Sequence, residues 1–329
     1  MKKIAAILLA AVMMVTLLTA CAKPNDTKNT QDISEGDKTL SVVTTIFPEY
    51  DWVRQILGDR FEEAEVTMLL DNGADLHNYQ PTADDIIKIT DCDLFIYVGG
   101  ESDGWAEEAL ANRQNGDMAV INLLETVGSA AKEEEVIEGM QDEEEDGEER
   151  PEYDEHVWLS FNNAKVICNK IAEELGKIDS EYQQTYLDNA VAYCEQLTAL
   201  DSEYQTVCAN ATTKTLLFGD RFPFRYLVDD YGLNYYAAFV GCSAETEASF
   251  ETISFLARKT DELGLKYIMT IENSDHKIAE TIVQNTEKKN QEILSLDSMQ
   301  GTTSDDVEAG ETYLNIMNQN LDVLKTVLN

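Results

Sequence analysis

The residues of this 329-residue chain with the clearest metal-binding chemistry are its three histidines, His77, His156 and His276. A neutral imidazole is a common ligand of Zn²⁺ and of related transition metals. His156 directly follows an acidic run, Glu133 to Glu155, in which 14 of 23 side chains are carboxylates. Imidazole and carboxylate together make a nitrogen and oxygen donor set that suits a divalent cation. Taken singly, each histidine could equally be a surface residue that caps a strand or helix. Their positions in the fold therefore decide between this role and that of a metal ligand.

The predicted secondary structure places the histidines in loops or at strand ends. β-branched and apolar runs predict three strands in the first half of the chain, over 40–46, 65–70 and 94–98. His77 lies in the loop after the second of these strands, and His276 comes shortly after a strand predicted over 267–271. Ligands of open α/β sheets bind beyond the carboxyl ends of the strands, so these positions favour a ligand-binding role.

The alternation of strands and helices predicts an α/β protein with two lobes, each a mostly parallel sheet flanked by helices. Strands of the second lobe are predicted over 215–218, 235–240, 267–271 and 293–296, with helices between them that include 222–231. The helical region 161–210 has almost no breakers and predicts a long rigid helix that joins the lobes. We therefore expect a first lobe over 40–160, which includes an acidic loop over 132–155, a second lobe over 211–329, and a cleft between them.

The N-terminus indicates an exported protein. Lys2 and Lys3 precede an apolar run, Ile4 to Leu18, which is shorter than the roughly 20 residues of a membrane span. This pattern is typical of a secretory signal over 1–20. The sequence Leu18-Thr19-Ala20-Cys21 resembles a bacterial lipobox, which implies cleavage before Cys21 and its lipidation. Residues 21–39 then form a polar, flexible tether that anchors an extracytoplasmic body to the cell membrane.

The charge of the chain excludes some classes of partner. Its formal net charge is −39, from 24 Lys and Arg against 63 Asp and Glu. Nucleic-acid binding is disfavoured because phosphate contacts need a cationic face, whereas cations are attracted to such a surface. The acidic loop has too many like charges to pack and is predicted to be mobile. It is either an arm that concentrates cations or a solvated insertion.

The cysteines do not form a recognised metal or redox motif. Five remain besides Cys21, and no two are spaced as CxxC, so neither a zinc ribbon nor a thioredoxin-like centre is indicated. Cys92 and Cys168 lie in apolar patterns and are predicted to be small buried residues. A disulfide among the other three, Cys194, Cys208 and Cys242, stays open.

Several motifs, in this order along the chain, resemble the metal-binding lipoproteins of ABC transporters for zinc and manganese. The resemblance covers Val42 to Leu328 and includes Thr44-Thr45-Ile46-Phe47-Pro48, Gly73-Ala74-Asp75-Leu76-His77-Asn78-Tyr79-Gln80-Pro81, Asp154-Glu155-His156-Val157-Trp158-Leu159-Ser160, Phe224-Arg225-Tyr226-Leu227, and Glu272 with Lys277-Ile278-Ala279-Glu280-Thr281. In that family an insertion rich in histidine or acidic residues precedes the second histidine, as the acidic run does here.

The resemblance implies that His77 and His156 are metal ligands of the first lobe. The family usually places a third histidine just before the motif at Phe224, where this chain has Asp220-Arg221. A guanidinium cannot coordinate a cation, so Arg221 leaves that ligand missing.

We hypothesise that His276 replaces the missing histidine, with a carboxylate from Glu272 or Asp275. Asp220 is a further candidate ligand. Arg221 is expected instead to pair with Asp220 or Glu272 and so to close the cleft.

The expected function is high-affinity capture of a divalent transition metal and its delivery to an ABC permease. Two or three imidazoles with one carboxylate favour Zn²⁺, and Mn²⁺ is the alternative if carboxylates predominate. We expect a monomer, no catalytic residues and no enzyme activity. A zinc hydrolase is a second hypothesis, but it needs a general base and an open coordination position, and no HExxH pattern is present. An adhesion lipoprotein is a third.

Overall fold

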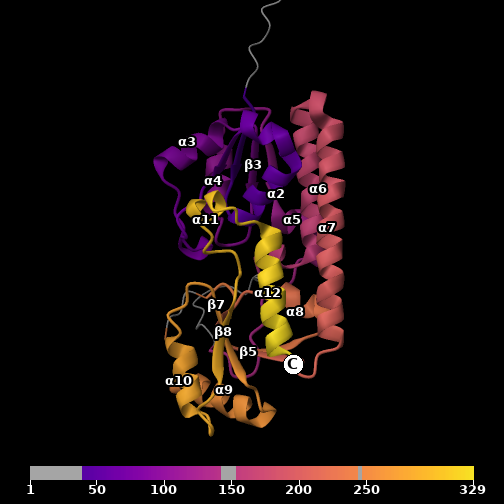
Figure 1. Ribbon diagram of the computed structural model, residues 1–329. Coiled ribbons are helices and arrows are strands. Elements are labelled where there is room, and N and C mark those ends of the chain that lie inside the picture. The colour runs from indigo at the N-terminus through magenta and orange to yellow at the C-terminus, as the bar shows by residue number, and fades with distance from the viewer. Residues whose placement is uncertain (1–38, 142–152, 244–246) are drawn as a thin grey trace, which may run out of the picture. The chain divides into compact units, whose positions relative to one another are not determined.

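Two four-stranded parallel sheets organise the computed structural model, which describes residues 39–141, 153–243 and 247–329 (Figure 1). The first sheet has the strand order β2-β1-β3-β4 and belongs to the first lobe. Its strands are β1 (Ser41–Thr44), β2 (Glu65–Met68), β3 (Leu94–Tyr97) and β4 (Ala119–Asn122). The parallel two-lobed α/β fold predicted from the sequence is confirmed, although β4 was missing from the prediction. The proposed signal, Cys21 and nearly all of the tether lie outside the described residues.

The second sheet has the order β6-β5-β7-β8 and belongs to the second lobe. Its strands are β5 (Thr215–Phe222), β6 (Asn234–Val240), β7 (Tyr267–Ile271) and β8 (Glu292–Leu296). The pairing of β5 with β6 is irregular between Phe218 and Arg221 and then resumes, with Arg221 opposite Phe239. The helix predicted to begin at residue 222 therefore begins later, and Arg221 is held in a strand.

Helices flank both sheets. Those of the first lobe are α2 (Phe47–Leu57), α3 (Ala83–Asp91), α4 (Trp105–Ala111) and α5 (Leu123–Val127). Those of the second are α8 (Arg225–Tyr231), α9 (Phe250–Leu263) and α10 (Lys277–Asn285). A capping box at the start of α3 fixes the point at which the His77 loop ends and the helix begins. Thr82 Oγ1 accepts from Asp85 N, and Asp85 Oδ2 accepts from Thr82 N, a capping box that satisfies the first turn.

The linking region consists of two helices, α6 (Phe161–Ile178) and α7 (Gln183–Ala209), which pack side by side (Figure 1). The long linking helix predicted from the sequence is confirmed as α7, although the helical region is divided at Asp179, whose φ of −116° and ψ of 73° end α6. The 27-residue α7 contacts α2 of the first lobe and α8 of the second. It is therefore the helix that reaches both lobes.

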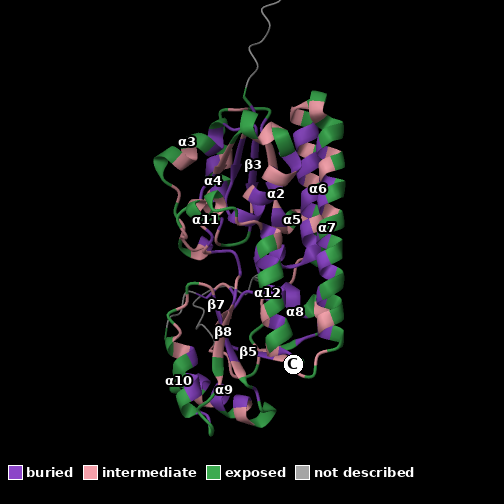
Figure 2. Ribbon diagram, in the orientation of Figure 1, coloured by how far each residue is buried: buried purple, intermediate pink, exposed green. Residues whose placement is uncertain are grey.

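The chain returns to the first lobe after β8. Ser304 N, in α11 (Ser304–Glu308), donates to Asp71 O at 2.8 Å, and Tyr313 N, at the start of α12 (Tyr313–Val327), donates to Asp51 Oδ2 at 3.1 Å. α12 then packs against α7 and β8. One buried apolar cluster contains residues of β1, α6, α7, β5 and α12, so the lobes share a core (Figure 2). The hydrogen bonds of the C-terminal segment and the shared core therefore connect the lobe of the first sheet to the lobe of the second.

The five cysteines of the described residues are free thiols. Cys92 and Cys168 are buried, which confirms their prediction as core residues. None of the described helices is both long and apolar enough to cross a membrane.

Candidate metal centre

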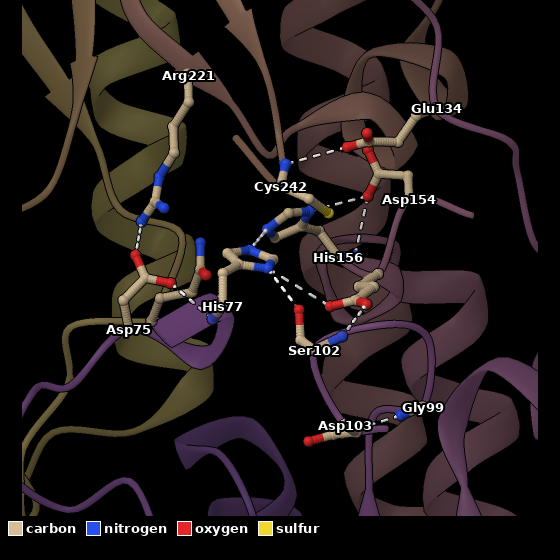
Figure 3. Close-up of polar contacts among 12 residues, drawn as sticks. Asp75, His77, Gly99, Ser102, Asp103, Glu134, Asp154, His156, Arg221 and Cys242 are labelled. Carbon is tan, nitrogen blue, oxygen red and sulfur yellow. Dashed lines mark hydrogen bonds and ion pairs between the residues drawn. The ribbon is translucent and has the colours of Figure 1, made fainter. Parts of the chain in front are cut away.

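His77 and His156 face each other in the structure (Figure 3). His77 lies in a short 3₁₀ helix, Leu76–Asn78, in the loop after β2, and His156 directly precedes another, Val157–Leu159. Their Nε2 atoms are 3.4 Å apart. His156 is fully buried and the His77 side chain is only 5% exposed. Two residues 79 positions apart in sequence thus direct one nitrogen each at the same point.

Asp154 fixes the orientation of the His156 ring. Its Oδ1 lies 2.9 Å from both the Nδ1 and the backbone N of His156. An ionised carboxylate can only accept hydrogen bonds, so Nδ1 carries the proton and Nε2 carries the lone pair. A carboxylate that holds the far nitrogen of an imidazole is the usual outer support of a metal-binding histidine. The Nε2 lone pair therefore points away from Asp154 and towards His77.

Ser102 and Glu155 hold the other ring. Ser102 Oγ is 2.7 Å from His77 Nδ1, Ser102 N donates to Glu155 Oε1, and Glu155 Oε2 is 3.6 Å from His77 Nδ1. Glu155 Oε2 is buried and has no hydrogen-bond partner among the described residues. Gly100 admits this carboxylate, because a Cβ there would lie 2.3 Å from Glu155 Oε1. A hydroxyl can donate or accept, so Ser102 allows the His77 Nε2 to present its lone pair.

The surroundings keep His77 neutral. Burial lowers the pKa of His77 to about 3, and the neighbouring His156 and Arg221 act in the same direction against the nearby Asp75. A neutral imidazole is the form that binds a metal. Two nitrogens bound tetrahedrally to Zn²⁺ at about 2.05 Å would be about 3.3 Å apart. The separation of 3.4 Å between the two Nε2 atoms is close to this value.

Cys242 completes the group of ligand atoms at this point. Among the described residues, one group of three or more His, Cys, Asp or Glu side chains could hold a metal ion. It consists of His77, His156 and Cys242, whose ligand atoms all lie within 4.8 Å of one another. Cys242 stands in the turn after β6, beyond the carboxyl end of a strand. The same positional signal that singled out His77 and His276 could have found it. From the sequence, Cys242 is predicted only as a possible disulfide partner.

The second-lobe residues predicted as ligands are not brought to this cluster. Glu272, just after β7, uses both carboxylate oxygens to accept from Ser298 N, Ser298 Oγ, Gln300 N and Gly301 N at 2.7–3.2 Å. Asp275 is exposed and paired with Lys277. His276 adopts a left-handed conformation with φ of 61° immediately before α10. Their assignment as metal ligands therefore stays a prediction that the cluster does not support.

Arg221 takes a partner that was not predicted. Its Nη2 pairs with Asp75 Oδ2 of the first lobe, while Asp220 Oδ2 accepts from Ser274 Oγ at 2.6 Å. Burial opposes ionisation of Asp75, but the Arg221 charge prevails and lowers the pKa of this carboxyl. Asp75 Oδ1 also accepts from His77 N. The ion pair therefore ties the second lobe to the loop that carries His77.

The structure leads to a clear expectation for His276. Replacing it with alanine should change the zinc dissociation constant by less than about threefold, because its ring is outside the cluster. Calorimetric titration of the chelator-stripped full-length protein would measure the change. A loss of more than about tenfold would restore His276 as a ligand.

Comparison with known proteins agrees with this fold. Residues 42–327 match the family described as zinc-uptake complex component A, periplasmic. The chain is 31% identical over 330 residues to the zinc-binding lipoprotein AdcA of Streptococcus pneumoniae, covering 99% of this chain and 61% of AdcA. It is 30% identical over 317 residues to the high-affinity zinc uptake system protein ZnuA of Bacillus subtilis, covering 95% of this chain and 94% of ZnuA.

Solved structures show the same architecture. The Zn(II)-bound ZnuA-like domain of S. pneumoniae AdcA aligns with a TM-score of 0.69 and 28% identity, covering 88% of this chain and 99% of the domain. The metal-dependent lipoprotein YcdH of B. subtilis aligns with a TM-score of 0.71 and 28% identity, covering 88% of this chain and 99% of YcdH. The match over almost the whole described body places this chain in the zinc-uptake component A family.

Proposed function

We propose that this protein captures Zn²⁺ outside the cytoplasm and delivers it to the permease of an ABC transporter for import. The observation that carries the proposal is the pair of buried Nε2 atoms, 3.4 Å apart, on rings whose Nδ1 atoms contact other groups. Two lone pairs directed at one buried point are favourable only with a cation or a proton between them. Membership of the zinc-uptake family supports the same cargo.

Binding follows from the groups around the two rings. Asp154 keeps the His156 proton on Nδ1, so His156 Nε2 is available to the metal at all times. When Ser102 Oγ accepts from His77 Nδ1, the His77 Nε2 is available as well. With a His77 pKa of about 3, protons do not compete for this ring at neutral pH. The site is therefore prepared for a cation before the cation arrives.

The donor set favours zinc over manganese. Mn²⁺ prefers carboxylate and water oxygens, whereas imidazole nitrogen suits Zn²⁺. The carboxylates of Asp154 and Glu155 lie on the Nδ1 sides of the two rings, away from the Nε2 atoms. The relatives named above are described as zinc-binding or zinc-uptake proteins.

Location and partners are part of the same proposal. The pattern at Cys21 and the lipoprotein relatives support a lipid anchor in the bacterial membrane, with the described body as a monomeric carrier outside it. A zinc-uptake component needs a permease that receives the metal. Because this chain spans 61% of the length of AdcA, activities of the remainder of AdcA are not assigned to it. The carrier role needs no catalysis.

Titration of the chelator-stripped full-length protein with zinc and manganese tests the proposal. We expect one tight zinc site and manganese binding weaker by at least about 100-fold. Equal or stronger manganese binding would contradict the choice of cargo. Absence of tight binding for either metal would contradict the carrier function.

A further inference from the structure

We propose that the Cys242 thiolate is the third protein ligand of the captured zinc, which gives a His₂Cys donor set. The inference rests on the proposed metal capture and specifies its chemistry. The Sγ atom and the two histidine nitrogens lie within 4.8 Å of one another (Figure 3). Zn–S bonds of about 2.3 Å and Zn–N bonds of about 2.05 Å put tetrahedral N and S ligands about 3.6 Å apart. A movement of about 1 Å would bring the sulfur to bonding distance.

Gly241 explains why the sulfur lies at this point. A Cβ at Gly241 would be 3.0 Å from His156 Cε1, 3.1 Å from His156 Nδ1 and 2.9 Å from Phe222 O. Glycine therefore lets the turn after β6 press its backbone against the imidazole ring. The next residue, Cys242, is carried to the edge of the two-histidine pair by this contact.

Glu134 holds the same turn from the other side. Its Oε1 accepts from Cys242 N at 3.0 Å. When zinc binds, the Sγ–H bond breaks, the sulfur electron pair forms the Sγ–Zn bond, and the proton leaves through Glu134 to solvent. The part of the acidic segment around Glu134 is thus fixed beside the site, contrary to the expectation of a mobile loop throughout 132–155.

The surroundings of Cys242 differ from those of the other thiols. Cys92, Cys168 and Cys208 are buried in the apolar core, and Cys194 Sγ lies 3.8 Å from a backbone carbonyl of α6. Cys242 alone among these five is grouped with two imidazole nitrogens. A thiolate at this position makes the site softer, so it should favour Zn²⁺ and Cd²⁺ and reject Mn²⁺ more strongly than nitrogen and oxygen donors would.

Cobalt substitution provides a direct test on the purified full-length protein. Co²⁺ bound to wild type should show a near-ultraviolet sulfur-to-metal charge-transfer band. The band should be lost in Cys242→Ser and kept in Cys194→Ser, the matched control far from the cluster in sequence and on α7. Zinc affinity should fall by at least about 100-fold in Cys242→Ser, since loss of even an outer support of a ligand costs about 10–100-fold.

Alkylation of the wild-type protein gives a second test that needs no variant. Iodoacetamide labelling followed by peptide mass spectrometry should show zinc-dependent protection at Cys242 and none at Cys194. Tight zinc binding without a charge-transfer band or protection would overturn the Cys242 ligand and leave the carrier function intact. Failure of wild type to bind zinc at all would overturn both.

Discussion

His156→Ala is expected to weaken zinc binding by at least about 1,000-fold, which corresponds to about 4 kcal/mol. The substitution removes one of two buried nitrogens that converge at 3.4 Å, and no other imidazole in the described residues reaches this cluster. It also leaves the Asp154 carboxylate without its hydrogen bond from the ring Nδ1, although the backbone N of residue 156 can still donate to it. Calorimetric titration of chelator-stripped protein would measure the loss.

A graded comparison separates ligand loss from damage to the fold. Asp154→Asn keeps the shape of the side chain but weakens its hold on His156 Nδ1, so zinc affinity should fall by about 10–100-fold. Asp201→Asn is the matched control, because Asp201 is also a buried acceptor but bonds to Tyr231 and Gln205 instead of the site. The Asp201→Asn variant should bind zinc as tightly as wild type. If Asp201→Asn lost as much affinity as Asp154→Asn, the effect would be one of stability and not of ligand support.

The parts of the fold that could be predicted are those determined by local sequence. The β-branched run at β1 acts over a few residues, and this strand is found in the structure. His77 and His276 were placed after strands for the same reason. In contrast, β4 offers only four residues with three apolar side chains, a signal too short to distinguish from a buried turn.

The parts of the site that were missed depend on contacts between distant segments. Arg221 pairs with Asp75 across 146 positions, so its partner could not be found from neighbouring residues. Glu272 was a reasonable metal ligand by type, but a loop 26–29 positions later occupies its carboxylate. Cys242 had the correct position after a strand, yet its closeness to His156 depends on how the turn at Gly241 packs against the ring.

Glu49→Gln is expected to flatten the pH dependence of stability. Glu49, in the first turn of α2, is fully buried; burial and then the charge of Asp103 raise its pKa from 4.5 to about 8, against hydrogen bonds from Thr45 and Ile46. Glu49 Oε1 and Asp103 Oδ1 are both buried without a hydrogen-bond partner among the described residues, so ionising the pair is unfavourable. Asp103 directly follows Ser102, the residue whose Oγ contacts His77 Nδ1.

Proton linkage determines whether the stability of the fold rises or falls with pH. A carboxyl whose pKa is higher in the folded state binds its proton more tightly there, so it stabilises the fold fully below pH 4.5 and loses that contribution as the pH rises through about 8. Well above pH 8, the contribution that this group has lost from the free energy of unfolding is about 5 kcal/mol. Wild type should therefore lose several kcal/mol of unfolding free energy between pH 6 and pH 9, and Glu49→Gln should lose much less.

Urea unfolding of the metal-free full-length protein across this pH range would measure the two slopes. Glu251→Gln is the matched control, because Glu251 is an exposed glutamate in the first turn of α9 and its replacement should leave the wild-type slope unchanged. At pH 9 the Glu49→Gln variant should be more stable than wild type. A wild-type stability that instead rose with pH would mean that the hydrogen bonds from Thr45 and Ile46 outweigh burial, and that Glu49 is an anion in the folded protein.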